Sequence, residues 1–211
     1  MKKGLFITFE GLDGSGKSTQ INLLKRYLSG KGHDIVFSRE PGGCPVSEKI
    51  RAIILGNENP MSAITEALLY AAARAEHVDR VVRPAIESGK TIILDRYVDS
   101  SLAYQGCGRE LGIQKVREIN DYAIRGIIPD ITVYIDLPVD IALKRIAAPL
   151  DRLESAGEAF FLRVLEGYNQ LTQLNPERII RIDGMRSAEA VFDDIKRRVD
   201  ALLDKAGGAN K

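Results

Sequence analysis

The sequence predicts a three-layer α/β sandwich, in which helices flank a five-stranded parallel sheet. Short apolar, β-branched segments alternate with amphipathic segments along the whole chain. This order is typical of α/β folds with right-handed crossovers between parallel strands. The central residues of TIIL and ITVYI are continuously apolar, as expected for strands that are covered on both faces.

The expected strands are short, and turn residues flank them. They are the segments 5–9 (LFITF), 34–38 (DIVFS), 91–95 (TIILD), 131–136 (ITVYID) and 178–183 (RIIRID). Between the strands, apolar residues recur every three or four positions, notably within 21–28, 64–72 and 160–171. That spacing places them on one face of a helix and predicts helices that pack on the sheet.

Length and composition indicate one soluble domain. The 211 residues predict a single domain over 1–205, with a small mobile insertion and a frayed tail at 206–211. The net charge of +1 argues against nucleic acid or a membrane surface as the main partner, since both usually require a basic excess. The two cysteines are expected to be reduced thiols in a cytoplasmic protein.

A glycine-rich segment directly follows the first predicted strand. GLDGSGKS, residues 11–18, fits the pattern G-x-x-x-x-G-K-[ST] between a strand and a helix. Glycines let successive backbone N–H groups point at phosphate oxygens, and the helix that follows adds the positive end of its dipole. We expect Lys17 to bridge the β- and γ-phosphates of a nucleotide and the Ser18 hydroxyl to bind Mg²⁺.

Two other strand ends carry candidate anion and metal ligands. Arg39 in SREPGG follows the second strand, where open α/β sheets bind ligands, although a surface turn with a solvated arginine fits equally well. Asp95 ends the third strand and resembles the acidic element that holds Mg²⁺ in P-loop NTPases. Arg96 beside it could neutralise an acceptor phosphate, or the two residues could form a simple salt bridge.

Five segments of the chain resemble thymidylate kinases in order and spacing. They are the phosphate loop with Asp13, REPGG (39–43), LLYAAARAEH (68–77), DRYVDSSLAYQG (95–106), and DRLE (151–154) followed by FFLRVLEGY (160–168). The resemblance covers essentially the whole chain. The phosphate loop lacks arginine and the later segment contains it, which is similar to the bacterial type of this family.

The resemblance implies an enzyme that transfers the γ-phosphoryl group of ATP to dTMP, giving dTDP and ADP in dTTP synthesis, with Mg²⁺ as cofactor. It implies that the ATP ligands are Gly11, Leu12, Asp13, Gly14, Ser15, Gly16, Lys17, Ser18, Thr19 and Arg145. The implied dTMP ligands are Asp13, Arg39, Pro41, Tyr70, Arg74, Arg96, Ser101, Tyr104 and Gln105. The implied catalytic residues are Lys17, Arg39, Asp95, Arg96 and Arg152, with Ser18 and Asp95 at the metal.

The resemblance also assigns roles within these sets. Tyr70 would stack on thymine, Arg74 would bind the edge of the base, and Tyr104 would lie against the sugar C2′. From helical spacing alone, Tyr70 fits core packing equally well. Arg152 would stabilise charge on the transferring phosphoryl group, and the bond before Pro41 is expected to be cis.

The resemblance implies a mobile lid at about 145–157. The chain departs from the family pattern in this lid, where IAAPLD carries no cation between Arg145 and Arg152. Cys44 also replaces the usual threonine after REPGG. A kinase for another nucleoside monophosphate and a deoxynucleoside kinase stay open as alternatives, and the shortened lid keeps open a catalytically inactive nucleotide-dependent scaffold. Relatives are homodimers, and the alanine-rich segment 64–77 could form such an interface or part of the core.

Overall fold

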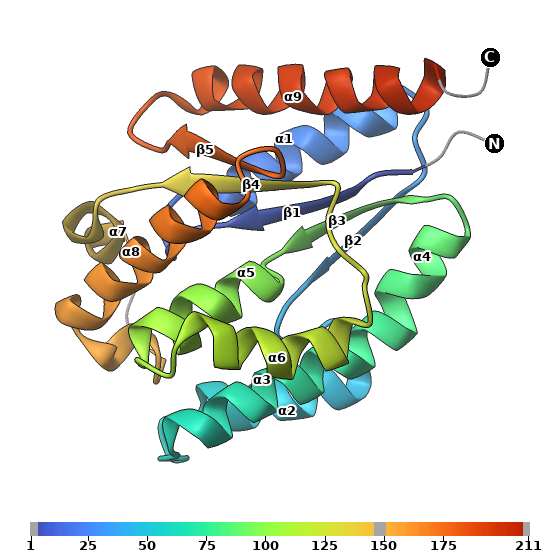
Figure 1. The fold of residues 1–211 in the computed structure, drawn as a ribbon. Helices are drawn as coiled ribbons and strands as arrows, with labels where there is room; N and C mark the ends of the chain where they lie inside the picture. Colours follow the sequence, from blue (N-terminus) through green and yellow to red (C-terminus); the bar gives the residue numbers. More distant parts are fainter. Residues whose placement is uncertain (1–3, 146–150, 209–211) are drawn as a thin grey trace.

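The computed structural model describes residues 4–145 and 151–208, with side chains described up to Lys205. Its sheet has five strands in the order β2-β3-β1-β4-β5, and every neighbouring pair is parallel, as predicted (Figure 1). The strands are β1 Phe6–Glu10, β2 Ile35–Arg39, β3 Thr91–Asp95, β4 Ile131–Asp136 and β5 Ile179–Asp183. Each predicted strand lies within one residue of an observed one.

Helices cover both faces of this sheet (Figure 1). The longer helices are α1 Lys17–Gly30, α2 Pro45–Leu55, α3 Ala63–His77, α6 Ile113–Ile124, α8 Glu158–Leu174 and α9 Ala188–Gly208. The short ones are α4 Arg83–Glu87, α5 Val98–Ser101 and α7 Val139–Arg145. Two π-helical segments, Val78–Val82 and Leu102–Gly108, and a 3₁₀ turn, Glu154–Ala156, complete the described elements.

Two apolar clusters form the core, one on each face of the sheet. Helices α1 and α9 pack on one face through side chains such as Leu24 and Ile195, both fully buried. The larger cluster includes Ile92 and Leu94 of β3 together with Tyr168 of α8. Because the central strands are covered on both sides, their continuous apolar runs are explained by the observed layers.

The carboxyl ends of β1, β2 and β3 bring the predicted motifs together. The Arg96 backbone N–H donates to the Phe9 carbonyl at 2.9 Å, and the Glu40 N–H donates to the Asp95 carbonyl at 3.0 Å. These bonds extend the parallel pairing just beyond the strands. The phosphate loop, the REPGG segment and the DRY segment therefore meet at one edge of the sheet, where open α/β sheets bind ligands.

The ends of the predicted domain are only partly described. Helix α9 continues to Gly208, so the helix runs three residues into the segment predicted to fray. The predicted lid includes residues 146–150, which lie outside the described residues, and its later part contains the 3₁₀ turn Glu154–Ala156. In the described parts of the chain, no helix is both long and apolar enough to cross a bilayer.

Candidate active site

The phosphate loop connects β1 to α1 and is built on close backbone approaches. A Cβ at Gly11 would lie 2.5 Å from the Ile135 carbonyl oxygen, and φ at this residue is +133°. Helix α1 begins directly after Gly16, whose φ is +96°. The Lys17 ammonium is buried and donates to the Gly11 and Leu12 carbonyls at 3.1 and 2.9 Å. The phosphate loop therefore holds the Lys17 ammonium close to the N-terminus of α1.

A cavity lies on each side of the phosphate loop. The first has a volume of about 150 Å³ and is lined by Asp13, Glu40, Pro41, Arg51, Leu55, Tyr70, Arg74, Arg96, Ser100, Ser101, Tyr104, Gln105, Asp151, Leu153, Glu154 and Phe161. We call it the acceptor cavity. The second, the donor cavity, has about 220 Å³ and is lined by Ser15, Gly16, Thr19, Gln20, Ile135, Arg145, Gly184, Arg186, Ala188 and Val191. The loop contributes residues to both walls.

Arg96 and Asp13 form the charged centre of the acceptor cavity. Arg96 Nη2 donates to Asp13 Oδ1 at 2.8 Å and to the Tyr104 hydroxyl at 3.3 Å, while Nη1 donates to Ser100 Oγ at 3.2 Å. Burial alone would raise the pKa of Asp13, but the Arg96 and Lys17 cations hold that pKa well below its usual range. The pair presents a fixed cation at the mouth of the phosphate loop.

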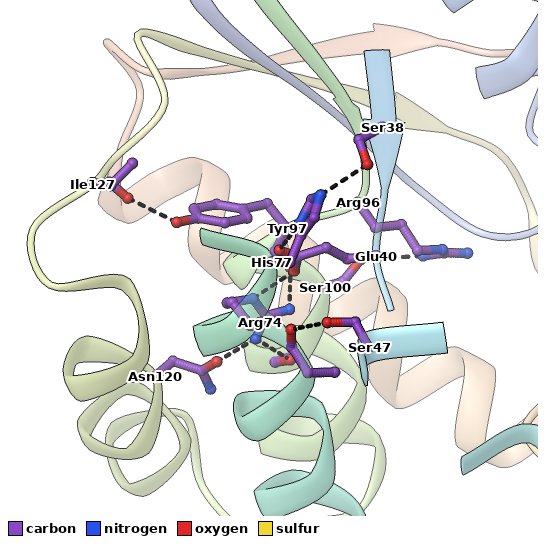
Figure 2. Close-up of polar contacts among 12 residues, drawn as sticks. Ser38, Glu40, Ser47, Arg74, His77, Arg96, Tyr97, Ser100, Asn120 and Ile127 are labelled. Carbon is purple, nitrogen blue, oxygen red and sulfur yellow. Dashed lines mark hydrogen bonds and ion pairs between the residues drawn. The ribbon is translucent and has the colours of Figure 1, made fainter. Parts of the chain in front are cut away.

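Arg74 also lines the acceptor cavity and is held by several hydrogen bonds (Figure 2). Nε donates to Glu40 Oε2 at 2.7 Å, and Nη2 donates to the Tyr97 carbonyl at 3.0 Å. Nη1 donates to both Ser101 Oγ and Asn120 Oδ1. Since a guanidinium group has five N–H donors, these bonds within the described residues leave one Nη2 hydrogen for a ligand.

The buried Glu40 carboxylate joins Arg74 to His77 (Figure 2). His77 Nδ1 lies 2.9 Å from Glu40 Oε1, and its Nε2 lies 2.8 Å from Ser38 Oγ. Arg74, His77 and Glu40 are each at most 4% exposed. This network connects helix α3 to the segment after β2. That segment contains the cis Glu40–Pro41 bond.

The structure brings most of the predicted dTMP ligands together. The acceptor cavity is lined by Asp13, Pro41, Tyr70, Arg74, Arg96, Ser101, Tyr104 and Gln105. Tyr70 is half-buried at this wall and also packs against the core, so its two interpretations are compatible. Arg145 lines the donor cavity, and its Nη1 donates to the Gly14 carbonyl at 3.3 Å.

Arg39 does not line either cavity. Its Nη1 donates to the Pro41 carbonyl at 2.8 Å and its Nη2 pairs with Glu48 at 3.0 Å, with the side chain 41% exposed. Arg51, which the sequence analysis did not single out, lines the acceptor cavity and donates to the same carbonyl at 2.9 Å. Its position two turns into the helix that begins after REPGG is the signal that could have identified it.

Arg152 lies behind the wall of the acceptor cavity. Its Nε donates to the Ile54 carbonyl at 2.8 Å and its backbone N–H to the Leu55 carbonyl at 3.3 Å, both at the C-terminus of α2. Its Nη2 is 2.7 Å from Glu66 Oε2, and the side chain is 14% exposed. An interaction with a transferring phosphoryl group would require Arg152 to leave Glu66.

The predicted metal ligands fit a magnesium ion that shares its shell with nucleotide and water. Asp95 Oδ1 is buried and has no hydrogen-bond partner among the described residues, whereas Ser18 is exposed in the first turn of α1. No group of three or more His, Cys, Asp or Glu side chains in the described chain is arranged for a metal ion. Mg²⁺ is commonly bound by one or two protein oxygens together with phosphates.

The fold and the two cavities define a class of protein. A parallel sheet with a phosphate loop between a donor and an acceptor cavity is the arrangement of P-loop NTPases of the nucleoside monophosphate kinase type. The thymidylate kinase family model matches residues 9–195. The chain belongs to the thymidylate kinase family.

Individual relatives agree with this assignment. The chain is 49% identical to the thymidylate kinase of Thermoanaerobacter sp. (strain X514) over 194 residues, which are 92% of this chain and 96% of the relative. It is 47% identical to the thymidylate kinase of Symbiobacterium thermophilum over 203 residues, 95% of each protein. The crystal structure of thymidylate kinase from Ehrlichia chaffeensis matches with a TM-score of 0.78 and 32% identity, covering 94% of this chain and 99% of that one.

Glu10 is a fully buried carboxylate just before the phosphate loop. It accepts hydrogen bonds from the Tyr97 N–H at 2.8 Å, from Ser100 Oγ at 2.5 Å and from the Tyr168 hydroxyl at 2.8 Å. Burial, followed by the nearby Asp99 carboxylate, raises the pKa of Glu10 to about 7 from its ordinary 4.5. Through its hydrogen bonds with Tyr97 and Ser100, Glu10 links the base of the phosphate loop to the segment that carries Arg96.

The raised pKa of Glu10 predicts a pH dependence of stability. The folded chain binds this proton more tightly than the unfolded chain, so the stabilisation is complete below about pH 4.5 and is lost as the pH rises to about 7. In Glu10→Gln, the free energy of unfolding should lack this dependence on pH. We expect urea unfolding to show a smaller difference in the free energy of unfolding between wild type and variant at pH 7.5 than at pH 5. If the free energy of unfolding depended on pH in the same way in the wild type and in Glu10→Gln, the raised pKa of Glu10 would be contradicted.

Proposed function

We propose that this protein transfers the γ-phosphoryl group of ATP to dTMP, giving dTDP and ADP. The observation that carries the proposal is the composition of the acceptor cavity. It combines the cations Arg51 and Arg96 with Tyr70 and the polar side chains Ser101 and Gln105. The two cations suit a phosphate, and the aromatic ring with the polar side chains suits a pyrimidine base.

ATP is the proposed donor, with its phosphates on the loop and its base in the donor cavity beside Arg145. Ser18 and Asp95 are the proposed protein ligands of Mg²⁺, which when bound would neutralise charge on the β- and γ-phosphates. The free thiols of Cys44 and Cys107 suit the predicted cytoplasmic location, where ATP and dTMP are available.

The protein groups mainly align two polyanions. The acceptor phosphate is already an anionic nucleophile, so the proposed reaction needs no strong base. Lys17 and Arg96, held in place by loop carbonyls and by Asp13, would offset the repulsion between the two nucleotides without rearranging. Tyr104, which packs against Arg96 with its ring centroid 5.0 Å from the guanidinium carbon, would form the wall beside the sugar.

A substrate panel tests the proposed activity. We expect ADP formation from ATP with dTMP to exceed that with dCMP or thymidine by at least about 10²-fold in kcat/KM, because buried polar groups are left unpaired by the wrong base. A coupled ADP-release assay measures each rate. Preference for thymidine would indicate a deoxynucleoside kinase, preference for another monophosphate would change the substrate, and inactivity with all of them would support the scaffold.

The structure places Arg51, which the sequence analysis did not single out, in the acceptor cavity in place of the predicted ligand Arg39. We expect Arg51→Met to raise the KM for dTMP at least about tenfold, because it removes a cation from the acceptor cavity, while Arg39→Met should have a smaller effect. The KM for ATP should stay unchanged in both. Arg80→Met, which changes a surface arginine paired with Glu76, is the control. A larger effect of Arg39→Met would restore Arg39 as the main phosphate ligand.

A homodimer is the proposed assembly, since α2 and α3 expose apolar side chains. Val46 and Ile53 lie two turns apart on α2, and Ile64 and Leu68 lie one turn apart on α3; they are between 46% and 60% exposed. These two helices pack against each other, and we propose that a second copy covers these exposed side chains.

A charge on this surface should weaken the dimer. We expect the wild type to sediment as a dimer and Leu68→Glu to shift it toward the monomer at micromolar concentration, because a carboxylate would be buried without a partner. Leu174→Glu, at the exposed C-terminus of α8, should leave the mass unchanged. A monomeric wild type would contradict the proposed assembly.

A further inference from the structure

Glu66 is a buried carboxylate of α3 that has no role in the mechanism above. Its side chain is 1% exposed and lies one turn before Tyr70, behind the wall of the acceptor cavity. Gln105 Nε2 donates to its Oε1 at 2.9 Å. Arg109 Nη2 and Arg152 Nη2 lie 3.1 and 2.7 Å from its Oε2. Between two guanidinium groups, this carboxylate acts only as a hydrogen-bond acceptor.

Glu66 thereby determines which way the Gln105 amide faces. The two ends of an amide have nearly the same shape but opposite hydrogen-bonding character, so a glutamine at a cavity wall fits equally well in two flipped orientations. Turned the other way, its carbonyl oxygen would face the Glu66 carboxylate and two acceptors would meet in a buried site, which is costly. The amide nitrogen is therefore held at Glu66, and Oε1 together with the second N–H of Nε2 is left for a ligand.

We propose that Glu66 is a positioning residue that makes the acceptor cavity prefer thymine to cytosine by fixing the orientation of the Gln105 amide. This inference rests on the proposed function. Thymine has an N–H at N3 beside the carbonyl at C4, whereas cytosine has a bare nitrogen at N3 beside an amino group. Donors and acceptors are thus exchanged along this edge, and a fixed amide can match only one of the two bases.

The other groups at the cavity wall cannot accommodate cytosine in place of Gln105. Arg74 offers only donors, and it is held by Glu40, Asn120 and the Tyr97 carbonyl, so it accepts no bond from the amino group of cytosine. Tyr70 is half-buried and packs against the core, which limits its movement. If the Gln105 amide were free to flip, it would be the group that most easily accommodates cytosine.

The test compares Glu66→Gln with the wild type on two substrates. We expect the ratio of kcat/KM for dTMP to kcat/KM for dCMP to fall at least about tenfold, because a neutral amide at position 66 pairs with Gln105 in either orientation. The KM for ATP should be unchanged. Glu76→Gln is the matched control, since it makes the same change on the same helix at a surface pair with Arg80, and its ratio should equal that of the wild type.

Two further outcomes separate positioning from simple support of the fold. An equal loss of both activities in Glu66→Gln, with the ratio unchanged, would overturn the inference. Gln105→Met provides a test that does not depend on whether Glu66→Gln folds: its ratio should also fall, and adding Glu66→Gln should lower it no further. An unchanged ratio in Gln105→Met would likewise overturn the inference, whereas a wild type inactive with dTMP would overturn the proposed function as well.

Discussion

The acceptor site depends on one buried ion pair, between Glu40 and Arg74. Both side chains are 2% exposed and their atoms approach to 2.7 Å, so removing either partner would leave an unpaired charge in the interior, at a cost of roughly 3–5 kcal/mol. The pair joins the segment after β2 to helix α3. Ser101 and Asn120 complete the shell of Arg74, so parts of the wall that are distant in sequence form one hydrogen-bonded unit.

Charged side chains that are held in place by hydrogen-bonding partners also explain how a chain with a net charge of only +1 can bind two polyanions. Its cations are placed locally and are already held in position: Lys17 by loop carbonyls, Arg96 by Asp13, and Arg51 by the Pro41 carbonyl. Preorganised charges of this kind stabilise developing charge without a cost of reorientation during the reaction. Overall charge is therefore a poor guide to anion binding in this fold.

The sequence predicted the sheet almost residue by residue, because strand length, continuous apolarity and flanking turns all agree at each strand. It also identified the phosphate loop, whose spacing reflects backbone geometry within a single segment. The roles of the arginines were harder to predict. Arg39 and Arg51 both lie near Pro41, and only the packing of α2 decides which one lines the cavity. Glu66 carried no signal, because its partners Gln105 and Arg152 are far away along the chain.

Glu66 also relates base selection to the role predicted for Arg152 at the transferring phosphoryl group. If Arg152 acts on the transferring phosphoryl group, it must leave Glu66, and Arg109 is then the cation that still pairs with this carboxylate. Arg109 need not move with Arg152, because its own contacts with Glu66, at 3.1 and 3.2 Å, do not involve Arg152. Two arginines on one carboxylate thus allow one of them to move while the amide keeps its orientation.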